Sequence, residues 1–165
     1  SNIILASPDM DRETFERDIA SDVLAPRRVA MDRRITVYVS GHDRALAASR
    51  TLHGYPRLGS PYCFNPFQAE ELAAKGLPER CYVQSAKGLT VVDTSDAKRG
   101  STGHSDFLSS AEACLDFIDV VAGIRTRPKR IPSAQDNVFL LAQPEKLDSD
   151  QHRAICSRKK GSGEE

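Results

Sequence analysis

The chain has 165 residues, which is enough for one domain with a buried core. Its 23 basic and 23 acidic residues give a formal net charge of zero, so the composition argues against nucleic acid or an anionic membrane as the main partner. No apolar stretch reaches the length of a membrane span. These features are typical of a neutral globular domain.

Apolar segments rich in β-branched residues alternate with segments of helical period, which predicts alternating strands and helices and hence a mainly parallel sheet. The first predicted strand covers residues 3–6. Asp11 is placed to cap a helix in which apolar residues recur every four positions over 15–23. Pro26 is expected to end this helix.

The second predicted strand, residues 35–40, has the strongest β-branched and aromatic pattern in the chain. A short helix is predicted over 45–52, with Gly54 placed to terminate it. Residues 55–88 are punctuated by prolines, which indicates an irregular insertion or lid-like region. One short helix, 68–75, is expected within it.

A third strand over 89–92 and a final helix from about Ser105 to Ala122 complete the predicted domain, residues 1–125. Residues 126–165 are expected to form a largely irregular tail with one docked segment at 138–141. The predicted fold class is therefore α/β, with a mainly parallel three-stranded sheet flanked by helices.

The cysteines are widely spaced and form neither a C-x-x-C motif nor a group with histidines, so we expect no metal site and no cofactor. They are Cys63, Cys81, Cys114 and Cys156. A disulfide between Cys63 and Cys81 would close the irregular region. Cys114 lies in a predicted helix, where it is most simply a small buried apolar residue.

Two loop residues combine the chemistry of a catalytic acid and base. Asp43 follows the second predicted strand in Gly41-His42-Asp43, and His104 follows the third in Gly103-His104-Ser105. Serine hydrolases of the α/β type place the triad acid and then the histidine in this order. Both loops leave the carboxyl ends of parallel strands, so the two side chains are expected to converge. Each residue also has a simpler interpretation, Asp43 as a helix cap and His104 as an exposed loop residue.

Other acids compete for the role of Asp43. Asp9 follows the first predicted strand and is the alternative acid, whereas Asp11 is better explained as a helix cap. Asp93 and Asp96 precede His104 closely and are interpreted as polar groups of the loop.

Longer strings of the chain resemble a family of bacterial α/β-hydrolases of unknown function, often labelled esterase or lipase-like. The similar segments are residues 2–11, 37–49, 52–54, 57–59, 91–93 and 103–105. The resemblance covers roughly residues 2–122. It implies that Asp43 is the triad acid and that His104 is the base.

The chain departs from the family in two respects. The family's serine, in a G-x-S-x-G elbow, is expected just before Ile3 and is not found in this sequence, and the stretch 61–87 is longer than expected. We therefore expect the C-terminal part of a hydrolase domain for a small-molecule ester, nearly inactive alone. Its expected partner is the missing N-terminal part or a second copy, bound through the strand edge at Ile3.

Two alternatives remain open. Gly41-His42-Asp43-Arg44-Ala45 resembles the aspartate nucleophile elbow of epoxide hydrolases and dehalogenases, in which His104 would activate water and Asp93 or Asp96 would orient it. The chain could also be a non-catalytic α/β interaction module or a degenerate hydrolase relic. A serine elbow at Ser105 is rejected because Phe107 stands where a small residue is needed.

Overall fold

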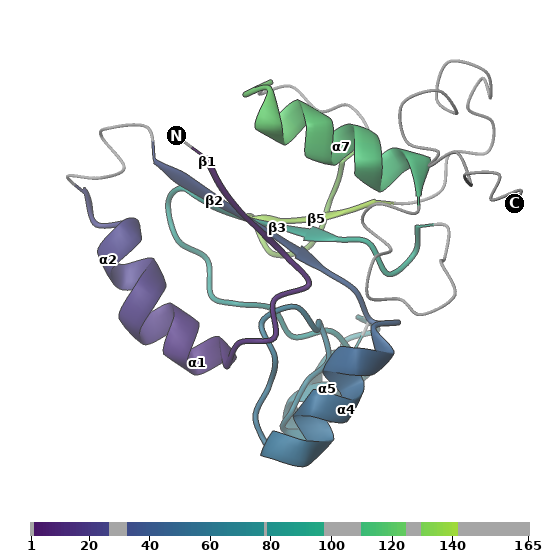
Figure 1. Cartoon of the computed structure of the whole chain (residues 1–165). Coiled ribbons are helices and arrows are strands. Elements are labelled where there is room, and N and C mark those ends of the chain that lie inside the picture. The colour runs from purple at the N-terminus through teal and green to yellow at the C-terminus, as the bar shows by residue number, and fades with distance from the viewer. Residues whose placement is uncertain (1, 27–32, 78, 98–109, 125–129, 142–165) are drawn as a thin grey trace, which may run out of the picture.

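A mostly parallel sheet forms the centre of the computed structural model, which describes residues 2–26, 33–77, 79–97, 110–124 and 130–141 (Figure 1). The strands are β1 (Asn2–Ala6), β2 (Arg34–Val39), β3 (Leu89–Asp93), β4 (Ile131–Pro132) and β5 (Val138–Leu140). Their order is β1-β2-β3-β5-β4, and only β4 runs antiparallel to its neighbour. The predicted α/β class is confirmed, and β4 and β5 enlarge the predicted three-stranded sheet.

The helices are α1 (Arg12–Thr14), the π-helix η1 (Phe15–Ala20), α2 (Ser21–Val23), α4 (Arg44–His53), α5 (Pro66–Ala74) and α7 (Ala111–Val121). Helices α1, α4, α5 and α7 begin at polar caps, whereas η1 and α2 continue from α1 without a side-chain cap of their own. Asp11 accepts a hydrogen bond from the Thr14 backbone amide at 2.7 Å, as its predicted role as a cap requires. Gly54, at a φ of 72°, ends α4, which confirms its predicted role.

One helix boundary differs from the prediction. Helix α7 begins at Ala111 rather than near Ser105, because the backbone of Ser110 is extended and its side chain accepts a hydrogen bond from the Ala113 amide at 3.0 Å. Residues 98–109 lie outside the described part of the chain.

The two faces of the sheet are covered differently. Alternate residues of β2 point to opposite faces, as the strand period requires. Ile35 and Val37 pack with Phe15 on the face covered by α1, η1 and α2, whereas Tyr38 packs on the face covered by α7 (Figure 1). On the α7 face the Tyr38 hydroxyl donates to Asp116 at 2.7 Å. The buried Asp116 also pairs with the guanidinium of Arg130, directly before β4.

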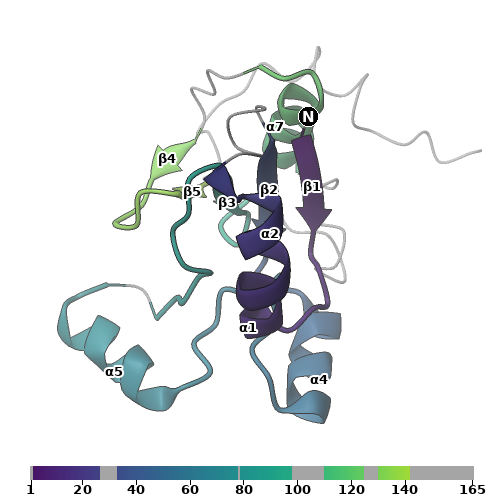
Figure 2. The same ribbon diagram turned by 90° about the vertical axis from the view of Figure 1, so that its left-hand side faces the viewer.

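Residues 61–82, here called the disulfide arm, carry α5 away from the sheet (Figure 2). The Cys63–Cys81 disulfide joins the two ends of the arm, so this possibility from the sequence is realised. Cys114 is also disulfide-bonded, which corrects its interpretation as a simple buried apolar residue.

Candidate functional site

The turns after β1, β2 and β3 lie together at the carboxyl edge of the sheet. The Gly41 amide, after β2, donates to Ser95 Oγ, after β3, at 2.8 Å. The Ser40 amide donates to the Gly59 carbonyl at 3.0 Å, and the Gly59 amide donates to the carbonyl of Pro8, after β1, also at 3.0 Å. These bonds bring the three turns to one edge, where open α/β sheets bind their ligands.

Asp43 is buried at this edge and caps α4. The residue is 3% exposed, and its Oδ1 accepts a hydrogen bond from the Leu46 amide at 3.0 Å. The cap occupies one oxygen, and a carboxylate has two oxygens with several acceptor positions. The simpler interpretation of Asp43 is thus correct, and it is compatible with a second bond from a histidine.

The backbone of Asp43 does not resemble a nucleophile elbow. Its φ of −72° and ψ of 99° are those of relaxed extended backbone. An elbow holds its nucleophile on a sharp, strained turn between a strand and a helix. The geometry therefore gives no support to the alternative in which Asp43 attacks the substrate.

His104 lies outside the described residues, so its contact with Asp43 stays a prediction. In sequence, β3 and the turn at Thr94 and Ser95 precede His104, and both Thr94 and Ser95 are buried. The Thr94 amide donates to the Val39 carbonyl at 2.9 Å. This turn, from which the His104 segment continues, is therefore fastened to the end of β2.

Asp9, the alternative acid, occupies a different environment. Its side chain is 51% exposed and forms an ion pair with Arg57, with Arg57 Nε 3.2 Å from Asp9 Oδ1. Ser49 Oγ donates to Asp9 Oδ1 at 2.8 Å, which ties the turn after β1 to α4. These contacts give Asp9 a structural role at the surface.

Asp93 is the centre of a buried network that the sequence did not indicate. Its Oδ1 accepts from the Ser95 amide at 2.8 Å and from Ser95 Oγ. Its Oδ2 accepts from the Tyr82 hydroxyl at 2.6 Å and from Arg80 Nη1 at 3.1 Å. The interpretation of Asp93 as a loop polar group is therefore wrong, whereas it suits Asp96, whose side chain is 55% exposed.

The network shifts the ionisation of its members. Burial and then the neighbouring Asp93 charge raise the pKa of Tyr82 well above its usual range, so its hydroxyl stays a donor at neutral pH. Burial lowers the pKa of Arg80, but its hydrogen bond to Asp96 and the charge of Asp93 outweigh burial and raise it overall. Arg80, Tyr82 and Ser95 thus connect the disulfide arm to the Gly41 turn through one carboxylate.

Ser7 is a second feature that the sequence analysis missed. It has a φ of 44°, the one positive φ of a non-glycine residue within the described ranges, and it lies directly after β1. Gly59 packs against this turn so closely that a Cβ on Gly59 would lie 2.6 Å from the Ser7 carbonyl carbon. The sequence signal here was Ser7-Pro8 directly after a predicted strand, and this pattern indicates only a turn.

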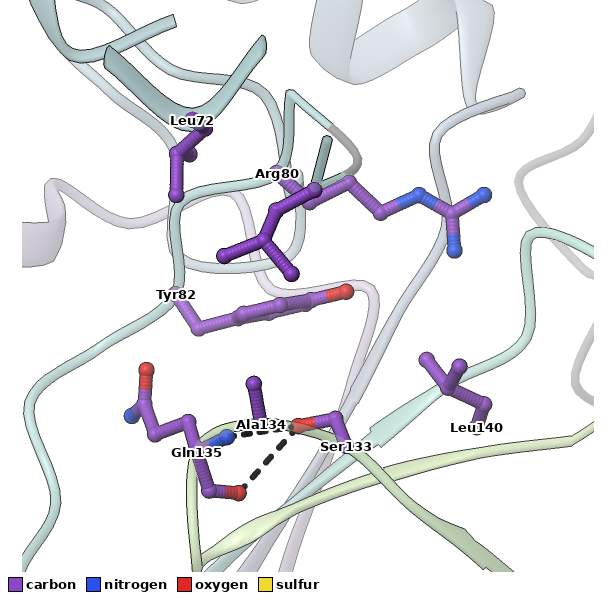
Figure 3. Close-up of a pocket in the computed structure, with 8 residues that line it drawn as sticks. Leu72, Arg80, Tyr82, Ser133, Ala134, Gln135 and Leu140 are labelled. Carbon is purple, nitrogen blue, oxygen red and sulfur yellow. Dashed lines mark hydrogen bonds between the residues drawn. The ribbon is translucent and has the colours of Figure 1, made fainter. Parts of the chain in front are cut away.

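A pocket of about 270 Å³ lies between the disulfide arm and the turn that joins β4 to β5 (Figure 3). Its lining residues are Leu72, Leu77, Arg80, Tyr82, Ser133, Ala134, Gln135 and Leu140. None of them belongs to the turns after β1 or β2, so the pocket is distinct from the surroundings of Asp43. It is connected to the carboxyl edge through Arg80 and Tyr82, which both contact Asp93.

Two further properties concern the described ranges alone. There, no three side chains of His, Cys, Asp or Glu stand close enough together to hold a metal ion. No helix of these ranges has the length and apolar character needed to cross a membrane.

The parallel order β1-β2-β3-β5, with helices on both faces and an acid at the carboxyl end of β2, defines an α/β domain with a candidate site at the carboxyl edge of its sheet. Comparison with protein families agrees with this class. The chain belongs to the family of alpha/beta hydrolases of unknown function (DUF900), whose model matches residues 1–123. No curated protein and no solved structure matches the chain.

Proposed function

We propose that this chain supplies the acid, Asp43, and the base, His104, of a serine esterase whose nucleophile lies in sequence upstream of residue 1. The main support is the burial of Asp43 at the carboxyl end of β2, beside the turn that leads from β3 toward His104. Family membership adds the hydrolase class.

In the proposed reaction His104 takes the proton from the serine hydroxyl as the serine oxygen attacks the ester carbonyl carbon. Asp43 fixes the imidazole tautomer and stabilises the imidazolium that forms. His104 then returns the proton to the alcohol oxygen, which leaves with the electron pair of the ester bond. A second cycle, with water in place of the serine, releases the acid and restores the serine.

Burial favours Asp43 over Asp9 as the acid. A carboxylate at low solvent exposure interacts more strongly with an imidazolium than one in water does. Asp43 is held in position by the Leu46 amide, whereas Asp9 is half exposed and its charge is already paired with Arg57.

The test is ester hydrolysis by the natural protein with its upstream sequence, measured with p-nitrophenyl butyrate. We expect Asp43→Asn and His104→Ala each to lower kcat by on the order of 10⁴-fold or more. His53→Ala, at the exposed end of α4, and Asp9→Asn are the matched controls and should retain the activity. Full activity in both triad variants would refute the proposal, and loss in Asp9→Asn alone would make Asp9 the acid.

A second candidate, an interaction module, is favoured by one observation. Within the described strands β1 pairs with β2 only, and Ile3 is 39% exposed on it. An edge strand of this kind can pair with another chain. Ile3→Lys should then reduce self-association measured by sedimentation, whereas Leu52→Lys, at a residue that is already 81% exposed, should not. A monomeric wild-type chain would contradict self-association through this edge.

A further inference from the structure

We infer that the pocket between the disulfide arm and the β4–β5 turn is a binding site for a small, neutral, mainly apolar molecule that carries one hydrogen-bond donor. Asp43 is not among the lining residues of the pocket, and occupation of the pocket does not depend on esterase activity. Its walls come from α5, the returning half of the arm, the turn at 133–135 and the end of β5 (Figure 3).

The size of the pocket sets the size of the ligand. Its volume is about 270 Å³. Pockets for drug-sized ligands begin near roughly 300 Å³, whereas an engineered cavity of about 150 Å³ binds benzene. The pocket therefore suits one substituted aromatic ring or a short aliphatic chain.

The charges of the lining indicate a neutral ligand. Arg80 is the one ionisable cation among the lining residues. Its guanidinium is directed away from the pocket in Figure 3 and is engaged by Asp93 and Asp96, each at 3.1 Å. The arginine thus presents its aliphatic stem to the pocket, and no uncommitted charge remains to compensate the desolvation of an ionic ligand.

The remaining apolar lining comes from Leu72, Leu77, Ala134 and Leu140, together with the ring of Tyr82. In Figure 3 the Tyr82 ring lies between Leu72 on one side and the 133–135 turn on the other. Because the Tyr82 hydroxyl is bonded to Asp93, the ring is held in a fixed position as an apolar and aromatic wall.

Gln135 provides the polar end of the pocket. Its Nε2 donates to the Val83 carbonyl at 2.8 Å and to Asn137 Oδ1 at 2.7 Å, which uses both of its hydrogens. The hydrogen bonds of the described ranges leave its Oε1 as an acceptor. Ser133 Oγ is already bonded to the Gln135 backbone. A ligand with one N–H or O–H donor complements this arrangement.

The pocket is preformed on the side of the arm. The Cys63–Cys81 disulfide fixes the base of the arm, and the Cys81 amide donates to the Pro61 carbonyl at 2.6 Å. Arg80 and Tyr82 on either side of Cys81 are anchored on Asp93. Walls that are already ordered lower the cost of ordering on binding.

The experiment is a titration of the folded chain with phenol, followed by amide chemical shifts in NMR spectra. We expect binding with Kd in the range of about 0.1–10 mM, as for a fragment of this size. The shift changes should centre on Tyr82, Gln135 and Leu140. Benzoate has a similar ring but a charge, so it should bind at least about tenfold more weakly.

Matched variants place the ligand in the pocket. Ala134→Phe puts a large side chain in the lining of the pocket, and Ala73→Phe makes the same change at an exposed alanine of α5 that does not line it. We expect phenol affinity to fall by at least about tenfold in Ala134→Phe and to be unchanged in Ala73→Phe. Absence of shift changes, unchanged affinity in Ala134→Phe, or equal affinity for benzoate would overturn the proposal.

Discussion

The β2–α4 unit, residues 34–53, and the disulfide arm, residues 61–82, both reach the carboxyl edge of the sheet, but different forces hold them there. Residues 35–39 of β2 are all buried, and α4 begins at the Asp43 cap and ends at Gly54. Helix α5 of the arm has no buried residue and a cap of its own at Asn65. The arm depends instead on a disulfide and on the contacts of Arg80 and Tyr82 with Asp93.

Core burial and local sequence pattern therefore hold the β2–α4 unit, which carries the proposed acid. A disulfide and a few polar contacts hold the disulfide arm, which forms one wall of the pocket. The stabilisation from core burial is spread over many atoms. The stabilisation of the arm comes from a few individual groups. Removal of one such group should therefore destabilise the arm more than the size of the removed group suggests, and four changes test this contrast.

Asp93→Ala should have the largest effect because it breaks the connection between arm and sheet. The Asp93 carboxylate is fully buried, and its loss leaves Arg80 and Tyr82 without their shared acceptor. We expect the free energy of unfolding to fall by about 3–5 kcal/mol in urea titrations. Asp96→Ala removes an exposed partner of the same arginine and should cost less than about 1 kcal/mol. Equal effects would show that Asp93 is not the connecting group.

Replacing both Cys63 and Cys81 by alanine should come next. The disulfide closes a loop with a sequence separation of 18 residues, so its loss should destabilise the fold by about 3 kcal/mol through the unfolded state. Hydrogen exchange should rise more in α5 than in β2 and β3, whose amides should lose only the protection that corresponds to the global loss of stability. Equal loss of protection in the sheet would contradict the separation of the two regions.

Gly59→Ala tests the sheet side of the contrast. A Cβ there would meet backbone atoms at 2.6 Å and 2.7 Å, in Ser7 and Pro8, and backbone cannot move away cheaply. We expect the free energy of unfolding to fall by about 1–3 kcal/mol, which lowers the urea midpoint at an unchanged m value. Gly76→Ala, in the arm, has open space at a φ of 68° and should alter exchange in α5 alone. A stable Gly59→Ala protein would contradict the close packing.

The smallest effect is expected for Asn65→Ala. Asn65 Oδ1 accepts from the Phe67 amide at 2.9 Å and caps a helix that has no buried residue. Exchange of the α5 amides should accelerate about fivefold, while the global stability changes by less than about 0.5 kcal/mol. Asp11→Ala removes the cap of the helix packed on the core, so it should cost about 1 kcal/mol globally. A global loss in Asn65→Ala would place α5 within the cooperative core.

The sequence predicted the strands at 3–6, 35–40 and 89–92 because each is a short apolar run that contains β-branched residues. The residues of β2 and β3 are mostly buried, whereas β1, at the edge of the described sheet, has no buried residue. Asp11 and Gly54 are also predictable, since capping depends on local residue types. The π-helix at 15–20 is not predictable, because a wider turn keeps the apolar spacing close to that of an α-helix.

Pairing between distant segments could not be predicted. Strand β4 has two exposed residues, so nothing in its pattern indicates that it joins β5. Arg80 and Tyr82 meet Asp93 only after the arm has returned to the sheet. For the candidate site, the sequence correctly placed Asp43 at the carboxyl end of a strand, and the pairing of Asp43 with His104 remains a prediction.

The parallel registers also bear on how the chain folds. Ile3 aligns with Ile35, Val37 with Val91, and Val91 with Val138, so every parallel neighbour is distant in sequence. Long loops must close before such contacts contribute, which makes parallel sheets slow to form. During synthesis the outer flank of β3 stays uncovered until residues 138–140 have left the ribosome, which leaves that flank available to chaperones.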